Sequence, residues 1–361
     1  MSIHPRRADE WTRAALGPPR AHGAPLPMVD MKAQPEDFRV EEQLSFEPSG
    51  AGPHWLLRVE KRGANTRWVA GELARLAGVA SNEVGYAGLK DRHAVTVQYF
   101  SVPEATKPAE FWIGVRTAEF KVLDVHANLR KLKRGALSGN RFQIRLRQVA
   151  WSREQLEVKL EALRTHGVPN YFGPQRFGRE GNNLDRVAAW IHSGMTPRHR
   201  AERGFALSAG RALIFNALLA ARIEAGDWSQ LSVGDLASLD GSASHFPVTQ
   251  VDDELQRRLR EFDLHPSGPL WGSGELRTTG QALIRELDVQ QAFKSVAVLL
   301  EAEGLIQERR ALRCAVRELS TTSDAGTLTI SFMLGRGQFA TAVLREICEL
   351  RSIPELEADH E

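Results

Sequence analysis

Alternating apolar and polar positions predict four strands along this chain. The predicted strands span residues 54–62, 94–102, 140–149 and 327–334. They are rich in β-branched and aromatic side chains, which are typical of strands. Because side chains at every second position of a strand point to the same face, we expect Asn140 and Phe142 to face the same surroundings.

Apolar residues at helical spacing predict the helices of the chain. The predicted helices span residues 66–77, 151–165, 208–225, 279–287, 290–302 and 339–350. Thr66 is placed to be the N-cap of the first helix. The last helix follows a strand and a turn, and only Glu346 interrupts its apolar stripe. Phe339 therefore lies at a strand–turn–helix corner, where functional residues often collect.

Segments rich in glycine and proline separate some of these elements. Residues 167–184 are predicted to be a functional loop or a domain boundary. Residues 226–280 are turn-rich, and residues 266–275 are their most irregular part. A chain of 361 residues has room for two domains, and no internal repeat is present. We therefore expect a two-domain α+β protein.

Composition indicates an ordinary soluble protein. The net charge is only +2, so nucleic-acid binding would depend on local clusters of positive charge. No apolar run approaches the ~18–20 residues that span a bilayer, and the N-terminus lacks an apolar secretory segment. The two cysteines, Cys314 and Cys348, are expected to be reduced core thiols of a cytosolic protein. No pair of histidines has metal-ligand spacing, so we expect no metal site.

The string GLKDR, at residues 88–92, is the sharpest candidate for chemistry. Asp91 stands between Lys90 and Arg92, and nearby cations favour the ionised carboxylate that a nucleophile or base requires. From composition alone, an exposed surface turn is the more common role of such a triplet. The string GRGQFA, at residues 335–340, fits a dinucleotide-binding fingerprint. It lacks the second parallel strand with its acidic residue, so no nucleotide cofactor is expected.

Positive charge is concentrated in residues 128–142. The basic residues of this segment are Arg130, Lys131, Lys133, Arg134 and Arg141. Contact with phosphate and a solvated hairpin explain this pattern about equally well. Phe38, Phe142 and Phe339 are candidates to stack on a base, although a single phenylalanine is more often part of a core.

The string GYAGLKDRHAVTVQYFSV, at residues 85–102, resembles the signature of the TruD family of tRNA pseudouridine synthases. Further segments resemble family segments in the family order: residues 35–66, 130–147, 168–184, 206–222 and 337–347. The resemblance covers the chain from about Gln34 to about Arg351. It is specific because GLKDR is followed by GNRF and by VPNYFGPQRFG.

The resemblance implies roles for five residues. Asp91 matches the catalytic aspartate of the family. Phe38, Asn140 and Phe339 match residues of the substrate site. Phe142 takes the place where other pseudouridine synthases commonly have a stacking tyrosine. These four residues are therefore expected to bind the substrate.

The resemblance also implies the fold and the domains. We expect a catalytic domain with a mixed, largely antiparallel sheet and flanking helices, formed by residues 31–166 and 314–361. A family-specific α+β domain is expected to be inserted at residues 167–313. Residues 1–30 are expected to be an N-terminal extension, disordered in part.

The implied reaction isomerises uridine to pseudouridine in tRNA, and uridine 13 in the D-arm region is the expected target. The reaction breaks the N1–C1′ bond and joins C5 to C1′, so it requires no cofactor. Asp91 could attack C1′, attack C6 or abstract the 2′ proton, and the sequence leaves this choice open. The alternative is a non-catalytic RNA-binding protein that retains the fold.

The expected partner is tRNA, with no membrane and no metal. The residues expected to contact tRNA phosphates are Lys90, Arg130, Lys131, Lys133 and Arg134. We expect a cytoplasmic monomer, because no exposed apolar stripe is predicted.

Overall fold

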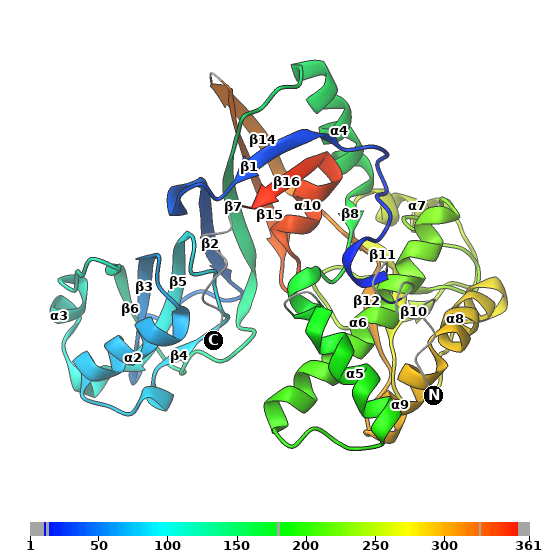
Figure 1. Ribbon diagram of the computed structural model, residues 1–361. Helices are drawn as coiled ribbons and strands as arrows, with labels where there is room; N and C mark the ends of the chain where they lie inside the picture. The colour runs from blue at the N-terminus through cyan, green and yellow to red at the C-terminus, as the bar shows by residue number, and fades with distance from the viewer. Residues whose placement is uncertain (1–10, 12–13, 179–180, 325, 353–361) are drawn as a thin grey trace. The chain divides into compact units, whose positions relative to one another are not determined.

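The computed structural model describes residue 11 and residues 14–178, 181–324 and 326–352 (Figure 1). Of the predicted N-terminal extension, residues 1–10 and 12–13 lie outside this description. The chain forms two compact units. Unit 1 consists of residues 1–24, 161–315 and 341–346, and unit 2 consists of residues 25–160, 316–340 and 347–361.

Unit 2 is built on a sheet in which ten strands are described. Seven follow one path, in the order β14 (Arg317–Asp324), β15 (Thr327–Gly335), β7 (Leu137–Arg147), β2 (Phe38–Leu44), β5 (Val95–Pro103), β3 (His54–Arg62) and β6 (Phe120–Asn128). The other three are β1 (Leu26–Met31), β16 (Cys348–Ser352) and β4 (Gly85–Tyr86). The β2–β5 and β1–β16 pairs are parallel and the remaining pairs are antiparallel. This confirms the expected mixed, largely antiparallel sheet.

Helices and short 3-10 turns complete unit 2. Their bounds are α2 (Thr66–Ala77), α3 (Ala109–Ile113), η1 (Pro35–Asp37), η2 (Ser81–Glu83) and η3 (Glu104–Thr106). The apolar stripe of α2 includes Val69 and Leu73, which are fully buried in one core with Leu57 and Phe100 of the sheet. Burial of this stripe holds the helix against the sheet beside the loop that follows β4.

Unit 1 contains a smaller sheet and most of the helices. Its sheet has the order β10 (His245–Pro247), β9 (Leu236–Leu239), β11 (Leu264–Leu270) and β12 (Glu308–Ala311), and β8 (Val168–Pro169) pairs with β13 (Arg313–Cys314). Its helices are η4 (Pro174–Phe177), α5 (Asn182–Ser193), α6 (Arg200–Glu224), α7 (Asp253–Arg260), α8 (Gly280–Ala292) and α9 (Lys294–Ala302). Two further helices, α4 (Arg153–His166) and α10 (Ala340–Ile347), contain residues of both units.

Among the described residues, one helix is long and apolar enough to cross a membrane by length and composition alone. This helix is α6, and more than half of its most apolar stretch is buried within the protein. The same test is passed by core helices of soluble proteins. Leu213 and Phe215 of α6 are fully buried, as expected for such a core helix.

The structure corrects three predictions of local structure. Asn65, not Thr66, precedes helix α2, because the Thr66 hydroxyl is used in tertiary hydrogen bonds. The predicted irregular segment 266–275 begins inside strand β11, where turn-forming residues are accommodated between two neighbouring strands. The predicted helix 339–350 ends at Ile347, because Cys348–Ser352 pairs with the N-terminal strand β1.

The structure also explains the acidic residue in the apolar stripe of the last helix. Glu346 is fully buried, and its Oε2 atom accepts hydrogen bonds from the backbone N–H groups of Ala21 (2.9 Å) and His22 (3.2 Å). These three residues belong to unit 1. A buried carboxylate that accepts hydrogen bonds from backbone N–H groups is stabilised despite its burial.

Candidate active site

Asp91 lies in the loop between β4 and β5, and its carboxylate forms an ion pair with Lys32. The Lys32 Nζ atom is 2.8 Å from Asp91 Oδ2, and the two side chains are 20% and 37% exposed. Sequence adjacency suggested Lys90 and Arg92 as the cations beside this carboxylate. Lys32 is 59 residues away in sequence, so no local pattern could have identified it.

Lys32 has an unusual backbone conformation. It directly follows strand β1 and has a φ angle of 58°, in the left-handed region that non-glycine residues rarely adopt. Its Nζ atom also lies 4.2 Å from the centre of the Phe38 ring, within the range of a cation–π contact. Strained backbone of this kind is frequent at functional sites. Lys32 thus connects the Asp91 carboxylate with the first of the predicted substrate-site aromatics.

The predicted aromatics Phe38 and Phe142 are in contact with each other. Their ring centres are 6.2 Å apart in an edge-to-face arrangement, and both side chains are almost fully buried. Phe142 also stacks on Phe332 of β15, at 5.4 Å, because the two residues are paired across the β7–β15 ladder. Sequence analysis did not single out Phe332. Asp91, Lys32, Phe38 and Phe142 thus form one continuous cluster.

Asn140 lies two residues before Phe142 on the same strand. Its Oδ1 atom is buried and has no hydrogen-bond partner within the described part of the chain. Buried acceptors are rarely left unpaired, so this atom has capacity for a ligand donor.

Phe339 follows the turn at residues 335–338 and is partly buried. Among the ring pairs of the described residues, none joins Phe339 to Phe38 or Phe142. The turn itself is attached to strand β7, because the Arg336 backbone N–H donates to Ser138 O at 3.1 Å. The structure therefore links this segment to the sheet, whereas no ring contact places Phe339 in the aromatic cluster.

Lys90 is held in the interior by a carboxylate that sequence analysis did not identify. Its Nζ atom forms a short ion pair with Glu42 of β2, and the two side chains are 6% and 0% exposed. Glu42 also accepts a hydrogen bond from the backbone N–H of Tyr99. This geometry leaves Lys90 poorly placed for the surface phosphate contact that the sequence suggested.

The loop that carries Asp91 is held by three further side chains, those of Thr66, Lys61 and Gln98, of which Gln98 donates to Gly88 O. Thr66 accepts a hydrogen bond from the Lys90 backbone N–H (3.0 Å) and donates one to Gln98 (2.8 Å). Lys61 is fully buried, and its Nζ atom donates to the carbonyl oxygens of Ala64 (2.7 Å) and Asp91 (2.8 Å). Burial lowers the pKa of Lys61 to about 8, although the charge of Asp91 raises it.

The basic segment lies next to the same loop. The Gly135 backbone N–H donates to Ala87 O at 2.8 Å. Arg134 lies 3.9 Å from the centre of the Tyr86 ring and donates to the Tyr86 hydroxyl. Arg336, from the distant turn, donates to Gly135 O.

The four predicted cations of this segment differ in their surroundings. Arg130 and Lys133 are exposed, whereas Lys131 donates a short hydrogen bond to Asn82 O. Arg134 is exposed but is held against Tyr86. Arg130 and Lys133 are thus the cations of this group that are most open to an external phosphate.

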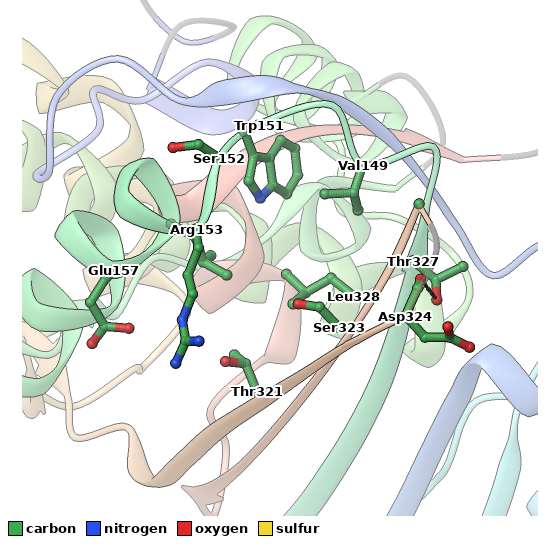
Figure 2. Close-up of a pocket in the computed structure, with 12 residues that line it drawn as sticks. Val149, Trp151, Ser152, Arg153, Glu157, Thr321, Ser323, Asp324, Thr327 and Leu328 are labelled. Atoms are coloured by element: carbon green, nitrogen blue, oxygen red, sulfur yellow. Dashed lines mark hydrogen bonds between the residues drawn. The ribbon is translucent and has the colours of Figure 1, made fainter.

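A pocket of about 500 Å³ lies elsewhere in unit 2, between the start of α4 and the β14–β15 hairpin (Figure 2). Figure 2 shows Trp151 and Arg153 near the start of α4 and Thr321 and Ser323 on β14. None of the predicted site residues lines it. Within the described residues, no group of three or more His, Cys, Asp or Glu side chains is arranged to hold a metal ion.

Comparison with known proteins identifies the family. The family model described as tRNA pseudouridine synthase D (TruD) matches residues 27–197 and 203–347. A protein of Nitrosococcus oceani named tRNA pseudouridine synthase D is 45% identical over 345 residues, which cover 94% of this chain and 95% of the relative. A protein of the same name from Xanthomonas oryzae pv. oryzae is 45% identical over 350 residues, with 92% and 94% covered.

A solved structure supports the fold. A crystal structure of a Methanosarcina mazei protein described under the TruD name superposes with a TM-score of 0.72 at 21% identity, covering 94% of this chain and 97% of that chain. The cluster around Asp91 therefore lies in a fold shared with this protein. On the family match and the two relatives together, the chain belongs to the tRNA pseudouridine synthase D (TruD) family and is a pseudouridine synthase.

Proposed function

We propose that this enzyme converts uridine to pseudouridine in tRNA, acts on uridine 13 in the D-arm region, and uses Asp91 as its catalytic carboxylate. The observation that carries the proposal is the Lys32–Asp91 ion pair, which lies against the Phe38 ring in a chain of this family. The enzyme is proposed to act as a cytoplasmic monomer with residues 31–166 and 314–361 as its catalytic domain and residues 167–313 as the inserted domain.

One oxygen of the Asp91 carboxylate is bound by a protein group and the other is not. Lys32 binds Oδ2, and within the described residues Oδ1 accepts no hydrogen bond. The cation stabilises the negative charge and orients the carboxylate, so Oδ1 is the atom offered to the substrate. It would attack C1′ or C6, or take the 2′ proton, in the step that breaks the N1–C1′ bond.

The target uridine must leave its base stack to reach this atom. Extrusion of a nucleotide costs a few kcal/mol, and stacking on an aromatic ring returns ~1–3 kcal/mol per base. Phe38 and Phe142 are the proposed apolar contacts of the uracil, with Phe339 closing the site from the turn before α10. Asn140 Oδ1 is the proposed acceptor for the uracil N3–H, because it is buried and has no protein partner in the described residues.

Affinity for tRNA would come mainly from phosphate contacts that do not depend on sequence. Arg130, Lys133 and Arg134 are exposed and lie on the segment that is hydrogen-bonded to the Asp91 loop. Neutralising phosphates with such side chains releases counterions, so binding should weaken as salt rises. Lys131 and Arg336 are proposed to support this segment from either side.

The proposal is tested by chemical mapping of pseudouridine in unmodified tRNA transcripts. Wild-type protein should produce one new signal at position 13, and Asp91→Asn should produce none while still binding tRNA. A signal at another position would keep the reaction and overturn the target. Full activity of Asp91→Asn would overturn the role of this residue. Binding by the wild type without any signal would favour a non-catalytic RNA-binding protein.

A further inference from the structure

Lys61 is a buried cation with no carboxylate in direct contact. It lies near the end of β3, is 0% exposed, and within the described part of the chain donates only to the backbone carbonyls of Ala64 and Asp91. Among the described residues, no carboxylate forms a salt bridge with it. Removing an ammonium group from water without a paired anion is costly. A neutral donor could satisfy two carbonyls at less cost, so the charge itself requires an explanation.

The charges around the Asp91 loop explain why a charged side chain is present at Lys61. Lys32 is paired with Asp91, and Lys90 is paired with Glu42. Lys61 is the third lysine beside two carboxylates, so the cluster carries one surplus positive charge. The charge of Asp91 favours protonated Lys61, whereas that of Lys90 disfavours it.

We propose that Lys61 is a positioning residue for the isomerisation: its hydrogen bond holds the Asp91 backbone, and its charge stabilises the ionised Asp91 carboxylate. The inference rests on the proposed catalytic role of Asp91. The hydrogen bond and the charge of Lys61 both act on Asp91. Lys61 therefore fixes the backbone of the same residue whose carboxylate must stay ionised. Lys61 does not touch the reacting atoms in this scheme.

The surroundings of Lys61 limit which groups can act on it. In the sheet it lies opposite Thr96 of β5 and Phe120 of β6. Apart from Lys90 and Asp91, the other titratable side chains of β3, β5, β6 and the Asp91 loop are His54, Arg58, Glu60, Arg62, Arg92, His93, Tyr99, Lys121, Asp124 and His126. Glu60 is paired with Lys121, and Arg62 is paired with Glu36. Arg92 donates to Gly63 O. Asp91 and Lys90 are therefore the charges that dominate the electrostatics of Lys61.

Titration separates the charge of Lys61 from its hydrogen bonds. Its pKa is lowered to about 8 by burial, against an ordinary value of 10.5. A neutral amine retains two N–H donors, so both carbonyls remain satisfied above pH 8 while the positive charge is lost. We expect kcat to fall as pH rises through about 8.

The contribution of Lys61 to the free energy of unfolding should rise with pH, in the opposite direction to kcat. Between pH 8 and 10.5 the unfolded chain holds the Lys61 proton and the folded chain has released it. The unfolded state then binds more protons, so this residue makes folding more favourable as pH rises. A loss of kcat in this range would therefore not be an effect of Lys61 on unfolding.

The test measures kcat and KM for an unmodified tRNA transcript from pH 6.5 to 9.5 in wild type, Lys61→Met and Lys121→Met. Lys121 is 41% exposed and paired with Glu60, so its variant is a matched control. Lys61→Met should lower kcat about tenfold, the effect of one pK unit of charge interaction, with little change in KM. It should also lose the alkaline decline near pH 8. Ionisation of the uracil would affect all three proteins equally.

Two outcomes would overturn the inference. One is Lys61→Met with wild-type kcat and the wild-type alkaline decline. The other applies even if Lys61→Met does not fold: the lysine ε-carbon NMR signal that titrates near pH 8 should move to lower pH in Asp91→Asn, and an unchanged midpoint would exclude the charge coupling. Failure of the proposed function is distinguishable, since it would appear as full activity of Asp91→Asn or as an inactive wild type.

Discussion

Lys32 and Asp91 lie 59 residues apart in sequence and form an ion pair of 2.8 Å. Lys32 comes directly after strand β1 and has a left-handed backbone conformation. The same ammonium lies over the Phe38 ring. The Lys32 side chain thus contacts both the proposed catalytic carboxylate and the Phe38 ring beside it.

Replacing Lys32 with methionine should lower kcat while leaving the fold intact. The pair is partly exposed, so its contribution to the free energy of unfolding is about 1 kcal/mol or less. Loss of the cation beside the carboxylate should lower kcat roughly tenfold, equivalent to about 1.4 kcal/mol in the barrier. Single-turnover kinetics and urea unfolding would check both parts. Unchanged single-turnover rates would exclude a catalytic contribution of Lys32.

Replacing Glu42 with glutamine should destabilise the protein. Lys90 would then be a buried cation without its anion, and breaking a buried pair in this way costs about 3–5 kcal/mol. The double variant Glu42→Gln, Lys90→Met removes both charges and should recover part of that loss. Urea unfolding of the wild type, the single variant and the double variant measures the difference. A single variant as stable as the wild type would show that the pair is not buried as described.

Phe38 and Phe332 offer a matched pair of aromatic substitutions. Both side chains are buried and both contact Phe142, but only Phe38 contacts Lys32. Each change to leucine should cost a similar free energy of unfolding, about 1–2 kcal/mol. Phe38→Leu should in addition reduce kcat/KM about tenfold, a loss of stacking of about 1.4 kcal/mol. Equal effects of the two variants on kcat/KM would contradict a substrate contact by Phe38.

The double variant Arg130→Ala, Lys133→Ala should bind tRNA more weakly without loss of kcat. Each phosphate contact adds about 0.7–0.9 to the slope of log affinity against log salt. Removing two contacts should therefore reduce that slope by about 1.5. Filter binding between 50 and 200 mM salt provides the measurement, with Lys121→Ala as the control. A slope equal to that of the wild type would show that these side chains do not contact phosphate.

Local patterns in the sequence determined many elements of this fold. Strand β3 and helix α2 have the predicted bounds, because alternation with period two and apolar spacing near 3.6 depend only on neighbouring residues. The string GLKDR was singled out by the cations that flank Asp91, and its resemblance to the family signature, with that of the further segments, indicated the family. Asn140 and Phe142 could be assigned to one strand face from the alternation with period two, and the burial of β7 alternates as that assignment requires.

Tertiary pairing decided the rest. The sequence favoured a helix at residues 348–350, but Cys348 pairs with Leu26 at the other end of the chain and forms strand β16. The loop around Asp91 has three partners that come from three different strands or their ends, namely Lys32, Lys61 and Glu42. Their contacts depend on sheet order and register, which bring distant segments together and which no short stretch of sequence specifies. The sequence by itself therefore determined the family and singled out Asp91 as the proposed catalytic carboxylate, whereas the cations that surround this carboxylate were decided by the register of the sheet.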